Sequence, residues 1–325
     1  MKTKVFISSV NDPRVNLALE EMLTQDCKED EYIFYLWQNE NTIVIGRNQN
    51  PHRECDLQKV EEDGVILVRR PSGGGAVFHD LGNLNFTFIA HEKKYSQQMN
   101  FEIVLDALKV FGLEGEFSGR NDLLIEDRKF SGNAYSHYKN TRVHHGTLML
   151  EVDLTKMSRY LNVHPLKMKA KGVTSVRSRV INLYELAPQM KVEDLKEALI
   201  GSFEARLGRA EKIEQLDKAS LRGYKHADKY FSWEWNIGET PNFSLELENK
   251  FDWGLISFFL DLNKGRIKRA KIFTDALVNE DFAGLGAALE GSEFNKKSME
   301  KVLFSQLSDK KISKELIEWL SSQGI

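Results

Sequence analysis

The hydrophobic positions up to Ile237 follow two different spacings. Short runs rich in aromatic and β-branched residues predict strands, and these runs occupy residues 5–8, 32–37, 42–45, 65–68, 84–90, 123–125, 129–135 and 147–152. Apolar residues three and four positions apart predict helices, which occupy residues 57–63, 103–111 and 192–206. A further helix is predicted to begin after Asp12, which suits an N-cap, with Pro13 at its first position.

The pattern changes after Ile237. Residues 238–242 are rich in turn-forming types and have no clear periodicity. Two strands are predicted at 250–262 and 266–274 with a hairpin turn between them, and helical patterns follow at 280–289, 298–307 and 312–321. We therefore expect two domains, residues 1–241 and residues 242–325, the second small enough to depend partly on docking against the first.

Composition and charge exclude several classes of protein. The chain has 45 Lys and Arg residues against 48 Asp and Glu, a formal charge of −3, which argues against a general binder of nucleic acid or anionic membrane. Its 41% hydrophobic residues argue against global disorder. Cys27 and Cys55 are too far apart for a disulfide framework, and the N-terminus lacks the apolar run of a secretion signal. No apolar run approaches the ~20 residues of a membrane span, so we expect a soluble cytoplasmic protein.

The densest chemical signal is a glycine-rich loop after the strand at 65–68. Three consecutive glycines, Gly73 to Gly75, cost conformational entropy on folding, so we expect positive φ or close approach of a ligand there. Backbone N–H groups in such a loop form an anion-binding concavity, to which Arg69 and Arg70 would add bidentate contacts. The loop is neither a P-loop nor a dinucleotide fingerprint. It predicts a cradle for a nucleotide or acyl phosphate, and a structural turn beside solvated arginines is the alternative.

A second polar stretch, residues 118–135, is predicted to form a hairpin with a tight turn at 126–128. In a strand beginning at Lys129, the polar residues 129, 131, 133 and 135 would share one face, and Phe130, Gly132 and Ala134 the other. A lysine directed into a polar pocket stabilises charge developing on an acyl or phosphoryl oxygen. A solvated lysine is the alternative.

Two further stretches add candidates. His144 and His145 are adjacent in a predicted strand and so point to opposite faces, which argues against joint binding of one metal ion; we expect His145 and Thr147 to face the pocket of Lys129. Residues 169–180 are basic and hydroxyl-rich, typical of a loop that folds over an anionic ligand or of a solvated loop. The basic residues at 264–271 either meet an acidic partner or form a solvated face.

Taken together, these stretches resemble the signature blocks of the lipoate–protein ligase family. The five blocks are residues 70–80, 119–122, 128–132, 144–147 and 171–179, in the family's order and spacing. The resemblance continues through residues 6–9, 46–51, 232–236 and 273–275, so it covers nearly the whole chain. The turn at 126–128 is shorter than in some relatives, but the lysine that follows it is retained.

The resemblance implies an α+β fold. Its catalytic domain would be a mixed β-sheet flanked by helices, like the cores of biotin–protein ligases and class II tRNA synthetases, followed by a small α+β accessory domain. It also implies a reaction in which lipoate and ATP, with Mg²⁺, give lipoyl-AMP and pyrophosphate. The acyl group then passes to a lysine of an apo lipoyl domain, in a 2-oxoacid dehydrogenase E2 subunit or the glycine-cleavage H protein. Octanoate is an alternative substrate, and neither a tightly bound prosthetic group nor a metal held by the protein alone is expected.

The resemblance also assigns roles to individual residues. Lys129 and Arg70 would be the catalytic cations, with Lys129 on the acyl carbonyl and the phosphate. The expected contacts to ATP and lipoyl-AMP are Arg70, Ser72, Gly73, Gly74, Gly75, Ala76, Val77, Phe78, His79, Asn121, Asp122, Lys129, Gly132, His145 and Thr147. Among these, Ser72 and His79 would line the lipoyl tunnel, and Asn121 and Asp122 would lie toward adenosine and Mg²⁺. The expected loop over the adenylate comprises Lys171, Gly172, Val173, Thr174, Ser175, Val176 and Arg177, and its closure would keep water from the anhydride.

Three other functions are considered. An ATP-independent octanoyl or lipoyl transferase of the same superfamily uses a cysteine within the relevant motif, and neither Cys27 nor Cys55 lies in a block. A biotin–protein ligase carries a different glycine and arginine pattern. A non-catalytic lipoate-binding protein would keep the fold, and the variant Lys129→Ala separates it from a ligase.

Overall fold

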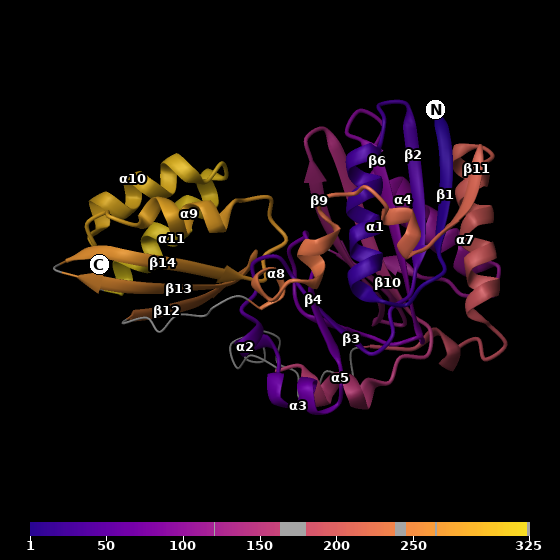
Figure 1. The fold of residues 1–325 in the computed structure, drawn as a ribbon, viewed down its shortest axis with the longest axis horizontal. Helices are drawn as coiled ribbons and strands as arrows, with labels where there is room; N and C mark the ends of the chain where they lie inside the picture. Colours follow the sequence, from indigo (N-terminus) through magenta and orange to yellow (C-terminus); the bar gives the residue numbers. More distant parts are fainter. Residues whose placement is uncertain (120, 163–179, 238–244, 264, 324–325) are drawn as a thin grey trace.

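The computed structural model describes residues 1–119, 121–162, 180–237, 245–263 and 265–323 (Figure 1). Its largest element is an eight-stranded mixed sheet with the order β11-β1-β2-β6-β10-β9-β8-β7. These strands are β1 (Lys2–Ser8), β2 (Glu31–Trp37), β6 (Asn83–His91), β7 (Glu116–Phe117), β8 (Asp122–Ile125), β9 (Arg128–Tyr138), β10 (Thr141–Met149) and β11 (Lys212–Leu216). The expected α+β fold with a mixed sheet flanked by helices is confirmed.

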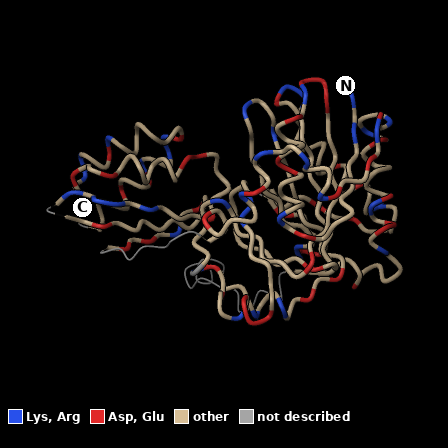
Figure 2. Tube along the Cα trace, viewed as in Figure 1, with Lys and Arg blue, Asp and Glu red and all other residues tan. Residues whose placement is uncertain are grey.

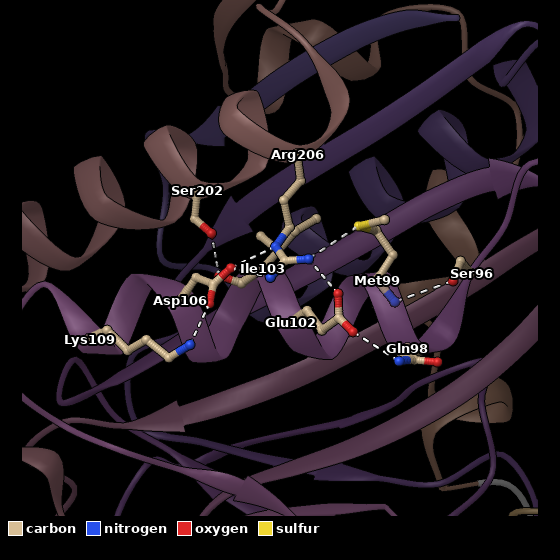
Figure 3. A network of polar contacts seen from close by, with 9 residues as sticks. All are labelled: Ser96, Gln98, Met99, Glu102, Ile103, Asp106, Lys109, Ser202 and Arg206. Carbon is tan, nitrogen blue, oxygen red and sulfur yellow. Dashed lines mark hydrogen bonds and ion pairs between the residues drawn. The ribbon is translucent and has the colours of Figure 1, made fainter.

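Helices cover both faces of this sheet. On one face lie α4 (Gln97–Lys109) and α7 (Val192–Leu207), held together by Arg206, which pairs with Glu102 and Asp106, and by a 2.8 Å hydrogen bond from Ser202 Oγ to a backbone oxygen (Figure 3). On the other face lies α1 (Pro13–Asp26), packed with the 3₁₀ turns η3 (Lys218–Leu221) and η4 (Ala227–Phe231). The turn η2 (Leu183–Glu185) precedes α7. The predicted start of α1 is confirmed, because Asp12 accepts a hydrogen bond from the Arg14 N–H group and Pro13 opens the helix.

A second, three-stranded sheet carries the glycine-rich loop. Its order is β4-β3-β5, with β3 (Thr42–Ile45), β4 (Ile66–Arg69) and β5 (Val77–His79). The loop joins β4 to β5 and therefore lies at one end of this small sheet. Against this small sheet pack α5 (Leu154–Tyr160) and α8 (Trp233–Asn236), and α3 (Leu57–Glu62) packs beside α5. The short helix α2 (Pro51–Glu54) precedes α3 in the chain.

The C-terminal residues form a separate sheet and core. Strands β12 (Leu245–Phe251), β13 (Gly254–Asn263) and β14 (Arg266–Thr274) are antiparallel neighbours, and helices α9 (Phe282–Leu289), α10 (Lys296–Gln306) and α11 (Lys310–Ser322) lie on one side of them (Figure 1). We call residues 245–323 the C-terminal unit. The predicted boundary at 241/242 falls on residues outside those that the structure describes, and the two-domain division stays a prediction.

Three predicted elements differ most from the structure in extent. The strand predicted at 250–262 is two strands, because a turn at Asp252 and Trp253 reverses the chain and pairs Phe251 with Gly254. The strand predicted at 147–152 is β10, which begins at Thr141 because its first residues pair with β6 and β9. The helix predicted at 103–111 begins at residue 97, after the N-cap Ser96.

Charged residues of both signs are interspersed over both parts of the molecule (Figure 2). On the basic strand β14, Arg266 pairs with Glu293 and Arg269 with Asp261, both at 2.9 Å. Two of the five basic residues predicted as a possible patch for an acidic partner are thus neutralised within the chain. Among the described residues, no helix has the length and apolar character to cross a membrane.

Candidate active site

Two cavities meet beside Lys129. The first, of about 160 Å³, has apolar walls that include Leu17, Trp37 and Val44. The second, of about 330 Å³, is lined by Met149, among others. The residues that border both cavities are Gly75, Ala76, Val77, Lys129, Gly132 and Thr147, all of which the sequence predicted as ligand contacts.

Within the glycine-rich loop, each glycine has a different surrounding. Gly74 has φ +92°, a conformation that L side chains rarely adopt. A Cβ atom on Gly73 would lie 2.4 Å from the backbone oxygen of Ala276 in the C-terminal unit, which is too close for any other residue. A Cβ atom on Gly75 would meet nothing within 4 Å, so this glycine faces open cavity. The prediction of positive φ is confirmed at Gly74.

The two arginines before the loop were expected either to add bidentate contacts to an anion or to be solvated, and the structure contradicts the solvated alternative. Both are buried. Arg69 donates to the backbone oxygens of Gly46, Arg47, Gln49, Trp235 and Asn236. It therefore fixes neighbouring loops, and it borders neither cavity. Burial lowers the pKa of Arg69 to about 10, which leaves it cationic at neutral pH.

Arg70 borders the first cavity, and its guanidinium holds the glycine-rich loop together. Its Nη2 atom donates to the backbone oxygens of Gly73 and Gly75 at 2.7 and 2.8 Å, and Nη1 donates to that of Val44 at 3.1 Å. With carbonyl oxygens turned toward Arg70, the loop is fixed in one conformation. Burial lowers the pKa of Arg70 to about 10, and the charge of Glu20 acts in the opposite direction.

A chain of buried hydrogen bonds connects Glu20 to Arg70. Glu20 Oε1 lies 2.9 Å from His145 Nδ1 and accepts a hydrogen bond from Thr87 Oγ1 at 2.7 Å. His145 Nε2 lies 2.7 Å from Ser72 Oγ, which accepts from Arg70 Nε at 3.0 Å. Because Ser72 Oγ accepts from Arg70, its own proton goes to His145 Nε2, and the proton of His145 Nδ1 goes to Glu20.

Sequence reasoning missed Glu20. The only available signal was its spacing, because Asn16, Glu20 and Thr24 lie four residues apart on α1 and all three are buried. Polar residues at the period of a helix's buried face mark a hydrogen-bonded site inside the protein.

Strand β9 corrects the predicted faces around Lys129. Its pairing with β8 shifts by one residue, so that Leu124 pairs with Lys129 and Leu123 with Ser131. This β-bulge places Phe130 in the core and turns Gly132, not Ser131, to the side of Lys129, because a bulge reverses the alternation of a strand. The predicted polar face of residues 129, 131, 133 and 135 is therefore wrong. The Gly132 N–H group donates to Thr147 Oγ1 at 3.1 Å.

Among the described residues, Asp122 is the acidic neighbour of Lys129. The Nζ atom of Lys129 lies 2.8 Å from Asp122 Oδ1, an ion pair whose atoms lack the alignment of a hydrogen bond. Both side chains are about one-third exposed, so this pair is weak enough for Lys129 to move to a ligand. Asn121, beside Asp122, borders the first cavity. The N–H group of Ile181 donates to the Lys129 backbone oxygen at 2.9 Å, whereas the predicted loop at 171–177 lies outside the described residues.

The two adjacent histidines point to opposite faces of the sheet, as predicted. His145 borders the first cavity. His144 lies between Asn100 and Asn133 in the core, where burial lowers its pKa to about 3. In the part of the chain that the structure describes, no group of three His, Cys, Asp or Glu side chains is placed to hold a metal ion.

The C-terminal unit contacts the glycine-rich loop directly. The Gly74 N–H group donates to the Ala276 backbone oxygen at 3.3 Å, and Leu277 borders the first cavity. Arg53 of α2 also pairs with Glu246 and, at 2.6 Å, with Glu248. The C-terminal unit thus contributes Leu277 to the wall of the first cavity.

Comparison with known proteins identifies the family. Residues 12–204 match the model of the lipoyl protein ligase A/B catalytic domain, and residues 240–320 match that of the bacterial lipoate protein ligase C-terminus. A lipoate-protein ligase A of Psychrobacter cryohalolentis is 41% identical over 95% of this chain and 93% of its own.

Solved structures agree with this result. LipL1 of P. falciparum, in complex with lipoate, aligns with a TM-score of 0.87 and 29% identity over 98% of this chain and 99% of its own. A bipartite lipoate protein ligase of Thermoplasma acidophilum, studied with its E2 lipoyl domain, covers 75% of this chain and all of its own at 26% identity and a TM-score of 0.65. A lipoate-protein ligase A bound with ATP covers 73% of this chain and 99% of its own at 25% identity and a TM-score of 0.64. With a catalytic-domain model matched over more than half of its length, this chain belongs to the lipoate–protein ligase family.

Proposed function

We propose that this protein activates lipoate with ATP and transfers the lipoyl group from lipoyl-AMP to a lysine of an apo lipoyl domain. The observation that carries the proposal is the meeting of two cavities at Lys129. A reaction between two molecules needs two adjoining compartments, and it needs a cation where a carboxylate and a phosphate approach one another.

The walls of each cavity favour one substrate. The acyl chain fits the first cavity, whose apolar walls lead inward from Lys129 to Leu17 and Trp37; we call it the acyl cavity. Adenosine fits the second cavity, which is about twice as large and lined by Phe78 and Met149; we call it the nucleotide cavity. Gly75 borders both cavities, so the loop would contact the acyl phosphate at the junction.

The residues at the junction suit both half-reactions. In the first, a carboxylate oxygen of lipoate attacks the α-phosphorus of ATP, the bond to the β-phosphate breaks, and pyrophosphate leaves. Lys129 would offset the negative charge of both reactants at that point. In the second, the uncharged amine of the acceptor lysine attacks the acyl carbonyl, AMP leaves, and the new amide nitrogen loses a proton. No nucleophile of this protein enters either step.

Mg²⁺ would accompany ATP. The Oδ1 atom of Asp122 is held by its ion pair with Lys129 at 2.8 Å, and it would be released when Lys129 turns to the acyl phosphate. Carboxylate oxygens are the ligands that Mg²⁺ prefers. Asp122, with Asn121 beside it, would hold the ion near the phosphates, where the ion would reduce their negative charge.

The two cysteines fit a ligase better than a cysteine-dependent transferase. Burial raises the pKa of both the Cys27 and the Cys55 thiol to about 12, whereas a nucleophilic cysteine needs a lowered pKa. Neither residue borders the two cavities at Lys129. Both are free thiols, which suits the reducing cytoplasm, where we propose that the protein acts.

The acceptor would be an apo lipoyl domain of a 2-oxoacid dehydrogenase E2 subunit or the H protein, by analogy with the relative studied together with its E2 lipoyl domain. The division into domains at 1–241 and 242–325, and the roles of the individual site residues, belong to the same proposal.

One experiment tests the proposal. Pyrophosphate release is measured with ATP, Mg²⁺ and lipoate for the wild type, for Lys129→Ala and for Lys139→Ala, a control at the far end of the β9–β10 hairpin. We expect the rate of pyrophosphate release to fall at least ~100-fold in Lys129→Ala, an effect comparable with removal of an oxyanion donor. The control should release pyrophosphate at the wild-type rate. Equal rates for Lys129→Ala and the wild type would overturn the role of Lys129, and absence of lipoyl-AMP from the wild-type reaction would overturn the ligase.

A further inference from the structure

The acyl cavity contains two buried nitrogen atoms without hydrogen-bond partners. They are His79 Nε2 and Asn85 Nδ2, and among the described residues neither has an acceptor. His79 is 3% exposed and Asn85 1%, and both border the cavity. Buried polar groups are nearly always hydrogen-bonded, so two such groups around one cavity indicate that its occupant supplies acceptors.

A chain of neighbouring amides determines which atom of His79 carries the proton. Asn16 Nδ2 donates to backbone oxygens of Val10 and Gln38, and to Asn39 Oδ1 at 3.0 Å. This fixes Asn39 with its Nδ2 atom toward His79, 3.2 Å from Nδ1. Nδ1 is therefore the acceptor, and Nε2 carries a proton that it offers to the cavity. Burial lowers the pKa of His79 to about 3, so the ring is neutral at neutral pH.

Asn85 presents a second donor from the sheet. Its Oδ1 atom accepts a hydrogen bond from Asn83 Nδ2 at 3.0 Å, whereas its Nδ2 group has no acceptor among the described residues. Asn85 pairs with Thr147 of β10 and with Trp37 of β2, both of which border the acyl cavity. The two donors come from different sheets, His79 from β5 and Asn85 from β6.

The strand order shows how far these donors lie from Lys129. Lys129 Nζ lies over Gly132, since a Cβ atom on Gly132 would be 2.7 Å from it. From Gly132 on β9, the floor of the cavity crosses β10 at Thr147, whose Oγ1 atom accepts a hydrogen bond from the Gly132 N–H group, and reaches β6 at Asn85. Two strand spacings amount to roughly 10 Å. An extended chain advances roughly 1.2 Å per bond, so the seven bonds of an eight-carbon acid with its carboxylate at Lys129 span roughly 8 Å. Asn85 therefore lies where the far end of such an acid arrives.

We propose that His79 and Asn85 recognise the ring sulfur atoms at the far end of lipoate, and that they thereby set a preference for lipoate over octanoate. The inference rests on the proposed function and names the substrate that this site selects. Sulfur is a weak acceptor, but an all-carbon chain offers none, and both donors would then remain unpaired. A site built with hydrogen-bonding groups rejects an analogue that leaves them unpaired. Trp37, whose ring centre lies 6.3 Å from that of His79, adds a favourable sulfur–aromatic contact.

The test compares three acids in ATP-dependent pyrophosphate release. They are lipoate, octanoate and 5-cyclopentylpentanoate, which has the ring of lipoate without its sulfur atoms. For the wild type we expect kcat/KM for lipoate to exceed that for each of the other two by roughly ten-fold or more. Equal values for lipoate and the cyclopentyl acid would mean that ring shape alone decides, and would overturn the inference without any variant.

Variants then locate the recognition. Asn85→Leu replaces the donor by an apolar side chain of similar size, and His79→Leu does so from the other wall. For either variant, we expect the ratio of kcat/KM for lipoate to kcat/KM for the cyclopentyl acid to fall by roughly ten-fold. Val44→Ala alters the cavity without removing a donor, and its ratio should stay that of the wild type. An unchanged ratio in both leucine variants would overturn the inference.

Failure of the proposed function gives a different result. If no acid supports pyrophosphate release, the ligase proposal fails, and calorimetric titration of the three acids still decides the inference. Tighter binding of lipoate than of the cyclopentyl acid would support sulfur recognition, and equal affinities would overturn it.

Discussion

The Nδ1 atom of His145 lies 2.9 Å from Oε1 of Glu20 in the interior of the molecule. This contact makes Glu20 the buried carboxylate connected, through His145 and Ser72, to the guanidinium of Arg70. Among the described residues, no carboxylate forms an ion pair with Arg70 itself. A buried cation without compensation is costly, so we infer that Glu20 balances the charge of Arg70 at a distance and keeps the glycine-rich loop in place.

Glu20→Gln tests the charge of this carboxylate separately from its hydrogen bonds. The amide oxygen of Gln can still accept from His145 and Thr87, but the negative charge is lost. We expect the free energy of unfolding to fall by about 1–3 kcal/mol, because Arg70 keeps its charge. The rate of lipoyl-AMP formation should fall about ten-fold. Urea unfolding and pyrophosphate release measure the two effects.

The control for this variant is Glu21→Gln on the same helix. Glu21 pairs with Lys229 at 2.6 Å and borders neither cavity at Lys129. The Glu21→Gln variant should therefore be less stable than the wild type but equally active per folded molecule. Wild-type activity in Glu20→Gln would show that the negative charge of Glu20 is not needed for the loop.

His144 is predicted to make stability depend on pH. Burial lowers its pKa from 6.5 to about 3 in the folded state, so below pH 6.5 the unfolded chain binds a proton that the folded chain does not. Stability therefore falls as the pH drops from 6.5 toward 3, by roughly 1 kcal/mol per pH unit for this residue. His79 acts in the same direction, because burial also lowers its pKa to about 3.

His144→Gln removes one of these two groups. We measure the free energy of unfolding in urea at pH 7.5 and at pH 5.5. The loss of this free energy between the two pH values should be smaller in the variant than in the wild type by roughly 1–2 kcal/mol. The wild type and His144→Ala serve as references, since the alanine variant also loses the group but adds a cavity. Identical pH dependence in the wild type and both variants would mean that His144 titrates normally in the folded protein.

Much of the fold follows from the spacing of hydrophobic residues, but the orientation of the site's side chains does not. The predicted N-cap at Asp12 depends on local chemistry and is confirmed. The predicted face of β9 is wrong because the bulge at Phe130 depends on pairing with β8, a tertiary contact. Arg70 was predicted to bind anions, yet its Nη2 group donates to carbonyls of its own loop and its Nε group to Ser72. Its Nη1 group donates to Val44, a bond that depends on how β3 packs.

The same limit applies to Glu20. It shares a buried face of α1 with Asn16, but its partners Thr87 and His145 are brought to it only by the assembled sheet. A single sequence gives the position of such a residue on its helix and not what it faces.

Two glycines of one loop predict opposite results for the same substitution. In Gly73→Ala the new Cβ atom would lie 2.4 Å from the backbone oxygen of Ala276, and a backbone atom cannot yield cheaply, so the C-terminal unit must move. In Gly75→Ala the Cβ atom meets no protein atom within 4 Å and instead occupies space at the junction of the two cavities. We expect small-angle scattering to give a larger radius of gyration for Gly73→Ala than for the wild type, and the wild-type value for Gly75→Ala.

Gly75→Ala should instead weaken binding of the adenylate by about ten-fold or more, because the backbone can no longer approach the acyl phosphate. Isothermal titration with a non-hydrolysable lipoyl-AMP analogue measures that effect. A normal radius for Gly73→Ala, or wild-type affinity for Gly75→Ala, would show that the loop and its neighbours rearrange at little cost.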